Sequence, residues 1–463
     1  MTPAHIDDYV GKSVFMVGIG GSSMSGLAEL LLHRGMRVLG SDRTRSHATD
    51  RLILLGIPVQ IGHSEGWVIG SDLVVYTAAI PEDNPERAAA KRLGIPQIER
   101  SELLGQLSEG YRTIAVAGAH GKSTVTSMLA TVFTLCDADP TVHIGGELPL
   151  WHSSVRTGNS DLFITEACEF AESFLTLKPW LSVILNIDAD HLDWYHSIEN
   201  IEAAFQKYID NTRPDGVLVA CAEDARVMRL VALERQKPAP RKVLTYGLSA
   251  DADVALCDLV LDDLGAPTFT VLHRGKRLFT LTLKILGDHN ALNALATIAC
   301  ALECGLDPAR VKASLEAFTG VSRRFELTGE VAGVKLYHDY GHHPNEFRTV
   351  VPLAKRIPHR KYWVVFQPHT YSRTKLLFDD FPPSFEGADE VVVTDIYAAR
   401  EQDPGDIHAT QVVASIAKAG IKATYCATFA EAKHYLVGHW QPGDVVLTLG
   451  CGNINLLNEQ LAE

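Results

Sequence analysis

The sequence has little that would tie it to a membrane, a disulfide framework or a metal knuckle. Its eight cysteines, at positions 136, 168, 221, 257, 300, 304, 426 and 451, include no C-x-x-C pair. Neither a zinc knuckle nor a set of disulfides is therefore indicated, and we expect most of these cysteines to be small buried apolar residues. No run reaches the roughly 18 apolar residues that a membrane-spanning helix needs, so we expect no membrane insertion.

Basic charge is also scarce. Lys and Arg number 42 against 56 Asp and Glu, which gives a formal net charge of -14. Because non-specific nucleic-acid binding depends on Lys and Arg neutralising phosphates, we expect no nucleic-acid partner. The segment from Met1 to Tyr9 carries Asp7 and Asp8 where a secretory signal would have a basic region and an apolar stretch. We therefore expect a cytoplasmic protein that holds any anionic ligand locally, through glycine loops, helix N-termini and metal ions.

Apolar runs alternate with helical patterns along almost the whole chain, which is typical of parallel sheets covered by helices. The fold class predicted is α/β. A length of 463 residues exceeds one ordinary core, because domains run to roughly 100 to 200 residues. Breaks in the pattern fall near Gly110 and around Gly320 to Arg324. We therefore predict three domains, spanning residues 1–110, 111–321 and 322–463.

A glycine-containing loop, Gly118 to Thr124, joins a predicted strand, Thr113 to Ala117, to a predicted helix. Backbone N–H groups at such a junction converge on phosphate oxygens. Lys122 would reach the terminal phosphates of a nucleotide, and the Ser123 hydroxyl would be a magnesium ligand. The alternative is an ordinary glycine turn with an exposed lysine; the strand before the loop and the helix after it favour the phosphate loop.

A second glycine-rich turn, Gly18 to Gly26, lies between a predicted strand, Ser13 to Val17, and a predicted helix, Leu27 to His33. Asp42 closes the next strand at about the position of a ribose-binding acid. The dinucleotide pattern G-x-G-x-x-G would require glycine at Ser23, which argues against a nicotinamide cofactor. Two interpretations of this turn remain: it binds the diphosphate of a nucleotide other than NAD, or it is a purely structural turn.

Acidic side chains and a histidine follow two predicted strands of the central region. Glu166 and Glu169 come after Leu162 to Thr165, and Asp188, Asp190 and His191 come after Val183 to Leu185. Ligands of open α/β sheets bind beyond the carboxyl ends of strands, so these groups are expected to face the phosphate loop. Since magnesium prefers oxygen ligands, Glu166 and Ser123 are expected to bind the same magnesium ion. For His191 two roles remain, that of a metal ligand and that of a hydrogen-bonding residue. For Asp188 we favour capping of the following helix.

Polar residues also gather later in the chain. Asp288 is predicted to cap a helix whose first turn carries His289, Asn290 and Asn293. Such amides would suit an adenine edge, although ordinary capping accounts for them as well. Further segments of this kind are Arg323 to Glu326 at the second domain break, Asp339 to Pro344, and Gln367 to Thr374. The last two follow predicted strands, and this shared position favours a functional role.

Six segments, in the same order as in the family, resemble the muramyl (Mur) ligases over essentially the whole chain. They are Gly18 to Gly21 with Met24 to Glu29, Gly118 to Thr124, Asn186 to Asp193, Arg323 to Glu326, Asp339 to Glu346, and Gln367 to Thr374. The resemblance implies a Rossmann-like N-terminal domain for a UDP moiety, a central P-loop ATPase domain with a mostly parallel sheet, and a Rossmann-like C-terminal domain. The C-terminal domain would close over the other two and admit an amino acid.

The resemblance also implies roles for individual residues. ATP contacts are expected from Gly118, Ala119, His120, Gly121, Lys122, Ser123, Thr124, His289, Asn290, Asn293, Arg324 and Asp339. Contacts with the UDP-linked substrate are expected from Gly20, Ser22, Ser23, Met24, Ser25, Asp42, Thr77, Ala78, Ala79, Tyr340 and Arg373. The implied metal ligands are Ser123, Glu166 and His191. The implied catalytic residues are Lys122, Glu166, His191, Arg324, His343 and Arg373.

The activity that the resemblance implies uses ATP and Mg2+ to join L-alanine to the lactyl carboxylate of UDP-N-acetylmuramate, in peptidoglycan precursor synthesis. The carboxylate would attack the γ-phosphate of ATP, and the amine of alanine would displace phosphate from the resulting acyl phosphate. Three alternatives stay open: a recycling ligase that adds a whole tripeptide to the same UDP sugar, a non-catalytic nucleotide-binding regulator, and a nicotinamide oxidoreductase. The chain is expected to act as a monomer or a homodimer.

Overall fold

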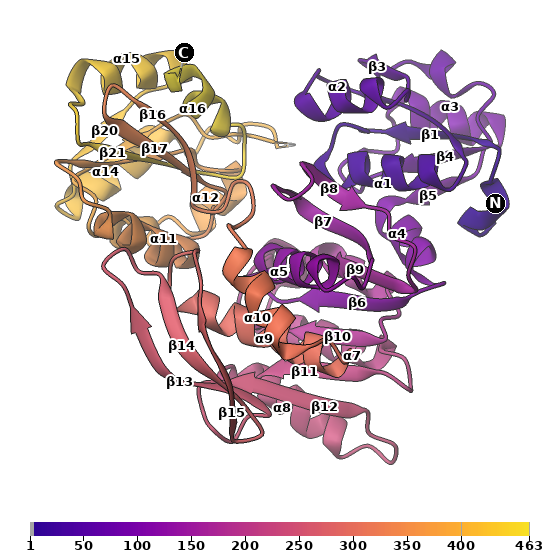
Figure 1. Cartoon of the computed structure of the whole chain (residues 1–463). Helices are drawn as coiled ribbons and strands as arrows, with labels where there is room; N and C mark the ends of the chain where they lie inside the picture. Colours follow the sequence, from indigo (N-terminus) through magenta and orange to yellow (C-terminus); the bar gives the residue numbers. More distant parts are fainter. Residues whose placement is uncertain (1–3, 400, 463) are drawn as a thin grey trace. The chain divides into compact units, whose positions relative to one another are not determined.

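The computed structural model describes residues 4–399 and 401–462 (Figure 1). The chain forms two compact units. The first unit runs to Leu259 and also contains Thr268–Lys284 and His289–Thr319; the second contains Val260–Pro267, Ile285–Asp288 and the chain from Gly320 onward. Two sheets belong to the first unit and one to the second. The predicted α/β class with mostly parallel sheets is confirmed.

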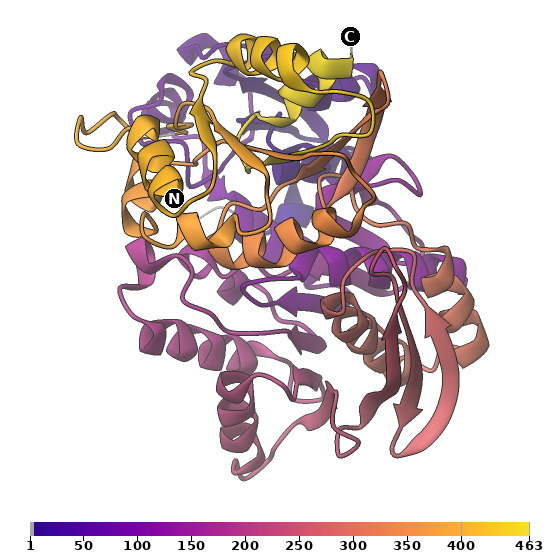
Figure 2. The same ribbon diagram turned by 90° about the vertical axis from the view of Figure 1, so that its left-hand side faces the viewer.

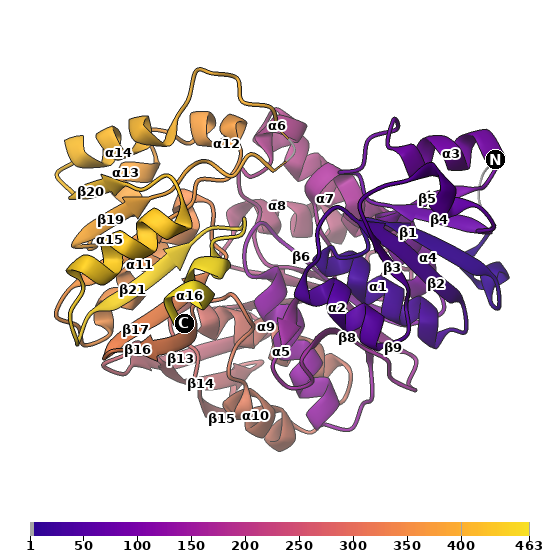
Figure 3. The ribbon, with the colours of Figure 1, turned by 90° about the horizontal axis from the view of Figure 1, so that it is seen from above.

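The N-terminal sheet of the first unit is parallel throughout, with strand order β3-β2-β1-β4-β5. Its strands are β1 (Ser13–Val17), β2 (Arg37–Asp42), β3 (Val59–Ile61), β4 (Leu73–Tyr76) and β5 (Gln97–Glu99). The helices around it are η1 (Ile6–Tyr9), α1 (Ser22–His33), α2 (His47–Leu54), η2 (Glu65–Val68), α3 (Pro85–Leu93) and α4 (Arg100–Ser108). Successive side chains of a strand point to opposite faces. Val14 and Met16 therefore pack with α1 and α2, while Phe15 and Val17 pack with α3 on the other face (Figure 3).

The central sheet has the order β15-β14-β13-β12-β11-β10-β6-β9-β7-β8. Its strands are β6 (Arg112–Ala117), β7 (Thr141–Leu148), β8 (Ser153–Arg156), β9 (Leu162–Glu166), β10 (Leu181–Ile184), β11 (Val217–Cys221), β12 (Lys242–Gly247), β13 (Val254–Leu261), β14 (Pro267–His273) and β15 (Lys276–Thr282). The pairs β7–β8 and β14–β15 are antiparallel, and β9, β6, β10, β11 and β12 run parallel. Figure 2 shows the long strands of residues 254–282 side by side, in pink.

Helices cover this central sheet. They are α5 (Lys122–Leu135), η3 (Phe170–Thr176), α6 (Leu192–Tyr195), α7 (Ile198–Asn211), α8 (Ala225–Arg235), α9 (His289–Glu303) and α10 (Pro308–Ala317). Helix α5 packs against β6, β7 and β9 and against the neighbouring helices α9 and α10. The near-continuous apolar runs of β6 and β10 are fully buried, as expected for strands that are covered on both faces.

The sheet of the second unit has the order β16-β17-β21-β18-β19-β20, with an antiparallel pair at β16–β17 and parallel pairs elsewhere. Its strands are β16 (Glu326–Val331), β17 (Val334–Asp339), β18 (Tyr362–Phe366), β19 (Glu390–Val393), β20 (Ala423–Tyr425) and β21 (Val445–Leu449). Its helices are α11 (Pro344–Arg356), α12 (Tyr371–Leu376), α13 (Phe381–Ser384), α14 (Ala409–Lys418), α15 (Phe429–His439) and α16 (Asn455–Ala462). Helices α11, α13 and α14 pack on one face, and α15 and α16 pack on the other. Figure 1 shows α11 and α14 on one side of the sheet and α15 and α16 on the opposite side.

Two local predictions were wrong. The glycine-rich turn is shorter than predicted, because α1 begins at Ser22 with Gly21 as its N-cap and includes Gly26. Glycine suits that helical position because a Cβ on Gly26 would lie 2.4 Å from Val155 Cγ1. The expectation that most of the eight cysteines are buried was also wrong, because only Cys221, Cys300 and Cys426 are buried and the other five are half-buried; all eight are free thiols.

Among the described residues, none of the helices is both long and apolar enough to cross a bilayer.

Candidate nucleotide and substrate site

The loop between β6 and α5 takes a conformation that only glycine tolerates. Gly118 has φ +151° and Gly121 has φ +86°. A Cβ at Gly118 would lie 3.0 Å from Leu185 Cβ and 3.3 Å from the backbone nitrogen of Asn186. The backbone therefore comes close to the end of β10, and the first turn of α5, with Ser123 and Thr124 partly exposed, begins directly after the loop.

Asn186 holds the loop in place. Its Oδ1 accepts a hydrogen bond from the His120 backbone N–H at 2.8 Å, and its Nδ2 donates to the His120 carbonyl at 3.0 Å. The backbone N–H of Ala119 also donates to the Asn186 carbonyl at 3.3 Å. Sequence analysis gave this asparagine no role of its own. Its position just after a strand that pairs with β6 is the signal that would have found it.

Lys122 lies in the middle of this arrangement. Its Nζ donates to the carbonyls of Gly118 at 2.5 Å and Ala119 at 3.2 Å, and it contacts both carboxylate oxygens of Glu169 at 2.9 and 2.8 Å. Burial by itself lowers the pKa of Lys122, but the nearby Glu169, Cys168 and Glu166 outweigh it and the net shift of the pKa is upward. Lys122 therefore carries a positive charge, as a phosphate-binding lysine must.

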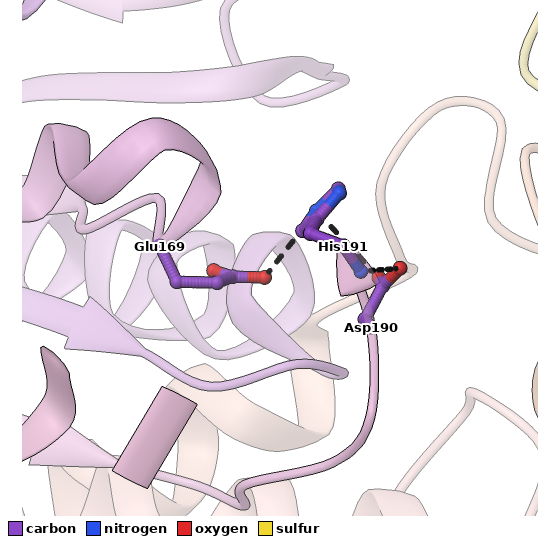
Figure 4. Close-up of side chains that lie close together, drawn as sticks. All are labelled: Glu169, Asp190 and His191. Carbon is purple, nitrogen blue, oxygen red and sulfur yellow. Dashed lines mark hydrogen bonds and ion pairs between the residues drawn. The ribbon is translucent and has the colours of Figure 1, made fainter. Parts of the chain in front are cut away.

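Glu169, Asp190 and His191 form a compact group (Figure 4). Glu169 of this group contacts Lys122. His191 Nε2 lies 3.8 Å from Glu169 Oε1 and 3.6 Å from Asp190 Oδ2, and one donor atom from each residue lies within 4.8 Å of the others. His191 has φ +54° and its ring packs against Phe170 at 4.9 Å between centroids. Two carboxylates and an imidazole at this spacing can hold a divalent cation.

Glu166 ends β9 and is near enough to Lys122 to raise the pKa of that lysine. Its Oε1 accepts a hydrogen bond from the Gly145 backbone N–H at 2.8 Å. The structure thus gathers Lys122, Glu166 and His191 at the same end of the central sheet. Glu169, which was expected to face the phosphate loop but was given no catalytic or metal-binding role, contacts Lys122 there.

The capping role favoured for Asp188 was wrong. Helix α6 begins at Leu192, and its N-cap is His191, which makes no side-chain capping bond. Asp188 instead accepts from the Ala189 backbone N–H at 2.8 Å and lies 3.3 Å from His120 Nε2. It therefore contacts the phosphate loop itself.

The start of α9 lies next to the same loop. Asn293 Nδ2 donates to Asn290 Oδ1 at 2.9 Å, so the two amides share one face of the helix. A Cβ at Gly121 would lie 3.0 Å from Asn293 Oδ1. Asn290 is buried, whereas Asn293 and His289 are half-buried. The predicted adenine-contacting residues therefore adjoin the loop.

In the N-terminal sheet, Asp42 holds the first glycine turn. Its Oδ2 accepts from the Gly20 backbone N–H at 2.9 Å. At the start of α1, Ser22 Oγ donates to the Gly145 carbonyl at 2.7 Å, and Ser23 Oγ lies 3.1 Å from His143 Nε2. The hydroxyl of Ser25 bonds only one turn back, to the Ser22 carbonyl at 3.1 Å.

The other residues predicted to meet the UDP-linked substrate in this part of the chain lie in two places. Met24 is buried inside α1. Thr77, Ala78 and Ala79 form a turn after β4, where Thr77 Oγ1 accepts from the Ala79 backbone N–H at 3.3 Å and both alanines are exposed. The turn follows the carboxyl end of a strand, as the α1 turn does, so both occupy the edge where such sheets bind ligands.

The second unit gathers its predicted site residues around Glu346. This carboxylate accepts from the backbone N–H groups of His342 and His343, and its Oε1 lies 3.5 Å from Arg324 Nη1. The Arg324 guanidinium also lies 5.4 Å from the ring centroid of Tyr340. His343 caps α11, its ring accepting from the Asn345 backbone N–H at 3.2 Å.

Asp339 and Arg373 complete this group. Asp339 is buried, which raises the pKa of its carboxyl to about 6, and it accepts from the backbone N–H groups of Phe325 and Gly341. Arg373 Nη1 lies 3.2 Å from His369 Nδ1, and both Arg373 and Arg324 act electrostatically on Cys451. Within the second unit, therefore, two arginines and several imidazoles lie at the carboxyl ends of β17, β18 and β21.

In the first unit, a strand leads into a glycine loop and a helix at Lys122, and carboxylates lie beside the loop. This arrangement is that of a phosphate-loop nucleotide-binding domain. Family models match nearly the whole chain: "Mur ligase family, catalytic domain" over residues 13–112, "Mur ligase middle domain" over 116–301, and "Mur ligase, glutamate ligase domain" over 323–452. The chain belongs to the Mur ligase family, and the resemblance carried by its six sequence segments is confirmed.

Curated relatives match the chain over almost their full lengths. A UDP-N-acetylmuramate–L-alanine ligase of Caldanaerobacter subterraneus is 43% identical, covering 98% of this chain and 97% of the relative. One of Alkaliphilus metalliredigens is 42% identical and covers 100% and 99%. Among solved structures, the UDP-N-acetylmuramate-alanine ligase of Thermotoga maritima superposes with a TM-score of 0.83 at 30% identity, covering 97% of this chain and 98% of its own. A murein peptide ligase of Psychrobacter arcticus, at 22% identity and a TM-score of 0.75, shares the fold.

Proposed function

We propose that this protein joins L-alanine to the lactyl carboxylate of UDP-N-acetylmuramate with cleavage of ATP to ADP and phosphate, as a step of peptidoglycan precursor synthesis. The observation that carries the proposal is the 42–43% identity, over nearly complete chains, to ligases named for this reaction. The phosphate loop with its fixed Lys122 supplies the chemistry that such a reaction needs.

In the first step, an oxygen of the lactyl carboxylate attacks the γ-phosphorus of ATP and the bond to ADP breaks. Little covalent chemistry is left to the protein in phosphoryl transfer, so its task is to position the reactants and to neutralise charge. The backbone N–H groups of residues 118–122 and the Lys122 ammonium are assigned to the phosphates. Asn186 keeps the loop in the conformation that presents them. Asn290 and Asn293 are assigned to the adenine.

Magnesium is part of the proposal. The oxygen-rich set of Glu166, Glu169 and Asp190, with Ser123 on the first turn of α5, suits this hard cation, and His191 adds a nitrogen donor. Glu166 and Ser123 would hold the ion nearest the phosphates, and His191 would contribute to a second one. A bound magnesium ion would neutralise charge on the phosphate oxygens during transfer.

In the second step, the α-amine of L-alanine attacks the acyl carbon, phosphate leaves, and the amide nitrogen loses a proton. An α-amine has a pKa of about 8, so a usable neutral fraction exists near neutral pH and a strong base is optional. We assign Arg324 and Arg373 to the negative charge of the phosphate and carboxylate groups. His342 and His343 are the residues that would assist proton removal. His343 could accept a proton only after its capping bond opens, because Nδ1 accepts the Asn345 N–H and Nε2 of the neutral ring then carries the proton.

ADP release, measured with each acceptor in turn, tests the proposal. L-alanine together with UDP-N-acetylmuramate should give ADP, and a product heavier than the UDP sugar by one alanyl residue. Release with a tripeptide in place of L-alanine would identify a recycling ligase instead. Tight nucleotide binding without substrate-dependent ADP release would identify a nucleotide-binding regulator.

The proposal places the reaction in the cytoplasm, where ATP is the phosphoryl donor, and gives the active form as a monomer or a homodimer. Cell fractionation tests the first statement. Sedimentation at the concentration used for the activity assay tests the second.

A further inference from the structure

Strand β7 contacts two parts of the first unit that the proposed reaction must use together. On one side it pairs in parallel with β9, the strand that ends at Glu166. On the other side β7 and β8 pack against α1, whose first turn carries the serines assigned to the UDP-linked substrate. A displacement of β7 would therefore reach both the nucleotide-sugar turn and the carboxylate beside Lys122.

One residue of β7 joins the two by direct hydrogen bonds. The carbonyl of Gly145 accepts from Ser22 Oγ at 2.7 Å, and the N–H of the same residue donates to Glu166 Oε1 at 2.8 Å. Ser22, at the start of α1, and Glu166, at the end of β9, are thus separated by a single residue of main chain.

His143 makes a second link, parallel to the first. It is only 4% exposed, and its Nε2 lies 3.1 Å from Ser23 Oγ and 3.3 Å from the Ser23 carbonyl. Its Nδ1 lies 3.4 Å from Thr165 Oγ1, the residue directly before Glu166. Neither His143 nor Gly145 was among the residues that the sequence singled out.

Strand β7 and its neighbour β8 lie in close contact with α1, and Gly145 lies close to Glu166. A Cβ on Gly26 of α1 would lie 2.4 Å from Val155 Cγ1 of β8 and 3.4 Å from His143 Cδ2. A Cβ on Gly145 would lie 3.0 Å from Glu166 Oε2. Close-packed groups shift together and not one at a time. Any rearrangement at the first turn of α1 must then be passed on to Glu166.

We propose that residues 143–145 of β7 couple occupation of the UDP-sugar turn to the position of Glu166 and so to nucleotide binding at the phosphate loop, with His143 and Gly145 as positioning residues. This inference rests on the proposed function only for the identity of the two ligands. Coupling between two sites is reciprocal, so each ligand must raise the affinity for the other by the same factor.

The affinity for a non-hydrolysable ATP analogue with Mg2+, measured by calorimetry with and without saturating UDP-N-acetylmuramate, tests the coupling. For the wild-type protein we expect the UDP sugar to tighten analogue binding by roughly fivefold or more. Ser22→Ala removes the bond to Gly145 and should reduce this factor to below about twofold. Ser108→Ala is the control, because the Ser108 hydroxyl donates one turn back to the Gly105 carbonyl within α4 and Ser108 is assigned to neither ligand, so this variant should keep the wild-type factor.

A second pair of variants separates coupling from simple stability. His143→Leu removes the polar contacts with Ser23 and Thr165 and should abolish the coupling, whereas His143→Gln keeps a side-chain amide within reach of Ser23 and should restore most of it. A wild-type factor near one, or a Ser22→Ala or His143→Leu variant with the wild-type factor, would overturn the inference. Failure of the ligase assay with intact coupling would count against the proposed reaction alone.

Discussion

The ammonium nitrogen of Lys122 lies 2.9 Å and 2.8 Å from the two carboxylate oxygens of Glu169, which is only 3% exposed. A charge-assisted pair of this kind is among the stronger polar contacts in a protein. If a nucleotide binds this loop as proposed, its phosphates would compete with Glu169 for the Lys122 ammonium. Glu169 Oε1 also lies 3.8 Å from His191 Nε2, so a carboxylate released from the lysine would be placed to bind the proposed magnesium ion.

Removing the lysine charge should stop the reaction. Without Lys122 the charge that develops on the transferring phosphoryl group loses a preorganised donor, and we expect Lys122→Met to lower kcat by about 10²- to 10³-fold or more. Lys178→Met is the control, since Lys178 is 67% exposed and pairs with Glu109. Steady-state ADP release measures both variants. Near-normal turnover in Lys122→Met would remove this residue from the mechanism.

Glu166 and the surface residue Glu172 make a matched pair for the magnesium assignment. Glu166→Gln keeps an acceptor for the Gly145 N–H but loses the negative charge, so the Mg2+ concentration for half-maximal activity should rise about 10-fold. Glu172→Gln, which removes only a pairing with Lys207, should leave that concentration unchanged. An unaltered Mg2+ titration in Glu166→Gln would show that the metal is held elsewhere.

The phosphate loop could be predicted from the sequence because all the residues that define it are consecutive in the chain. Glycines, a lysine and a hydroxyl residue follow one another between an apolar strand and a helix, and the structure places them so. The direct contact between Glu169 and Lys122 could not be predicted in the same way, although Glu169 was expected to face the loop. It lies 47 residues from Lys122 in the chain. After β9 the backbone has positive φ at Ala171 and Glu172. No periodicity in the sequence predicts this backbone conformation.

The capping role of Asp188 and the links through β7 show the same limit. An aspartate ahead of a helix favours capping, but the chain turns at His191 and leaves Asp188 beside His120 instead. His143 sits within an apolar strand, where its partners Ser23 and Thr165 come from separate elements. Contacts between distant elements depend on packing, which local sequence patterns do not encode.

His143 should make stability depend on pH. Burial, the largest effect, and Arg100 lower the pKa of His143 from its ordinary 6.5 to about 4, although its bond to Ser23 opposes them. Between these values the unfolded chain binds a proton that the folded chain does not, so the stability due to this residue is complete above pH 6.5 and is lost as the pH falls toward 4.

Chemical denaturation of the wild type and His143→Gln at two pH values measures the effect. Because glutamine does not titrate, the stability advantage of the wild type should shrink by about 2 kcal/mol between about pH 7.5 and about pH 5. A difference that stays constant over this range would mean that His143 is protonated in the folded protein as readily as in the unfolded chain.

Arg324 should affect turnover more than substrate binding. Its guanidinium is fixed between Glu346 and the ring of Tyr340, so it is preorganised for an anion that forms during the reaction. We expect Arg324→Ala to lower kcat by about 10²-fold with a much smaller change in KM for L-alanine. Arg348→Ala, in the same unit and paired with Asp380 at the surface, is the control. Equal losses in both variants would point to a general loss of structure.

Gly118→Ala tests whether the loop geometry itself is required. The alanine Cβ would lie 3.0 Å from Leu185 Cβ and 3.3 Å from the Asn186 backbone nitrogen, and neither group is the far end of a flexible chain. The loop must then shift away from β10, so the bonds from Ala119 and His120 to Asn186 should weaken and nucleotide affinity should fall at least about 10-fold. At Gly110 an added Cβ meets nothing within 4 Å, and its φ is not positive, so Gly110→Ala should bind nucleotide as the wild type does. If Gly118→Ala binds the ATP analogue with unchanged affinity, phosphate binding does not depend on the close approach of the loop to β10, and the role given to Asn186 is refuted with it.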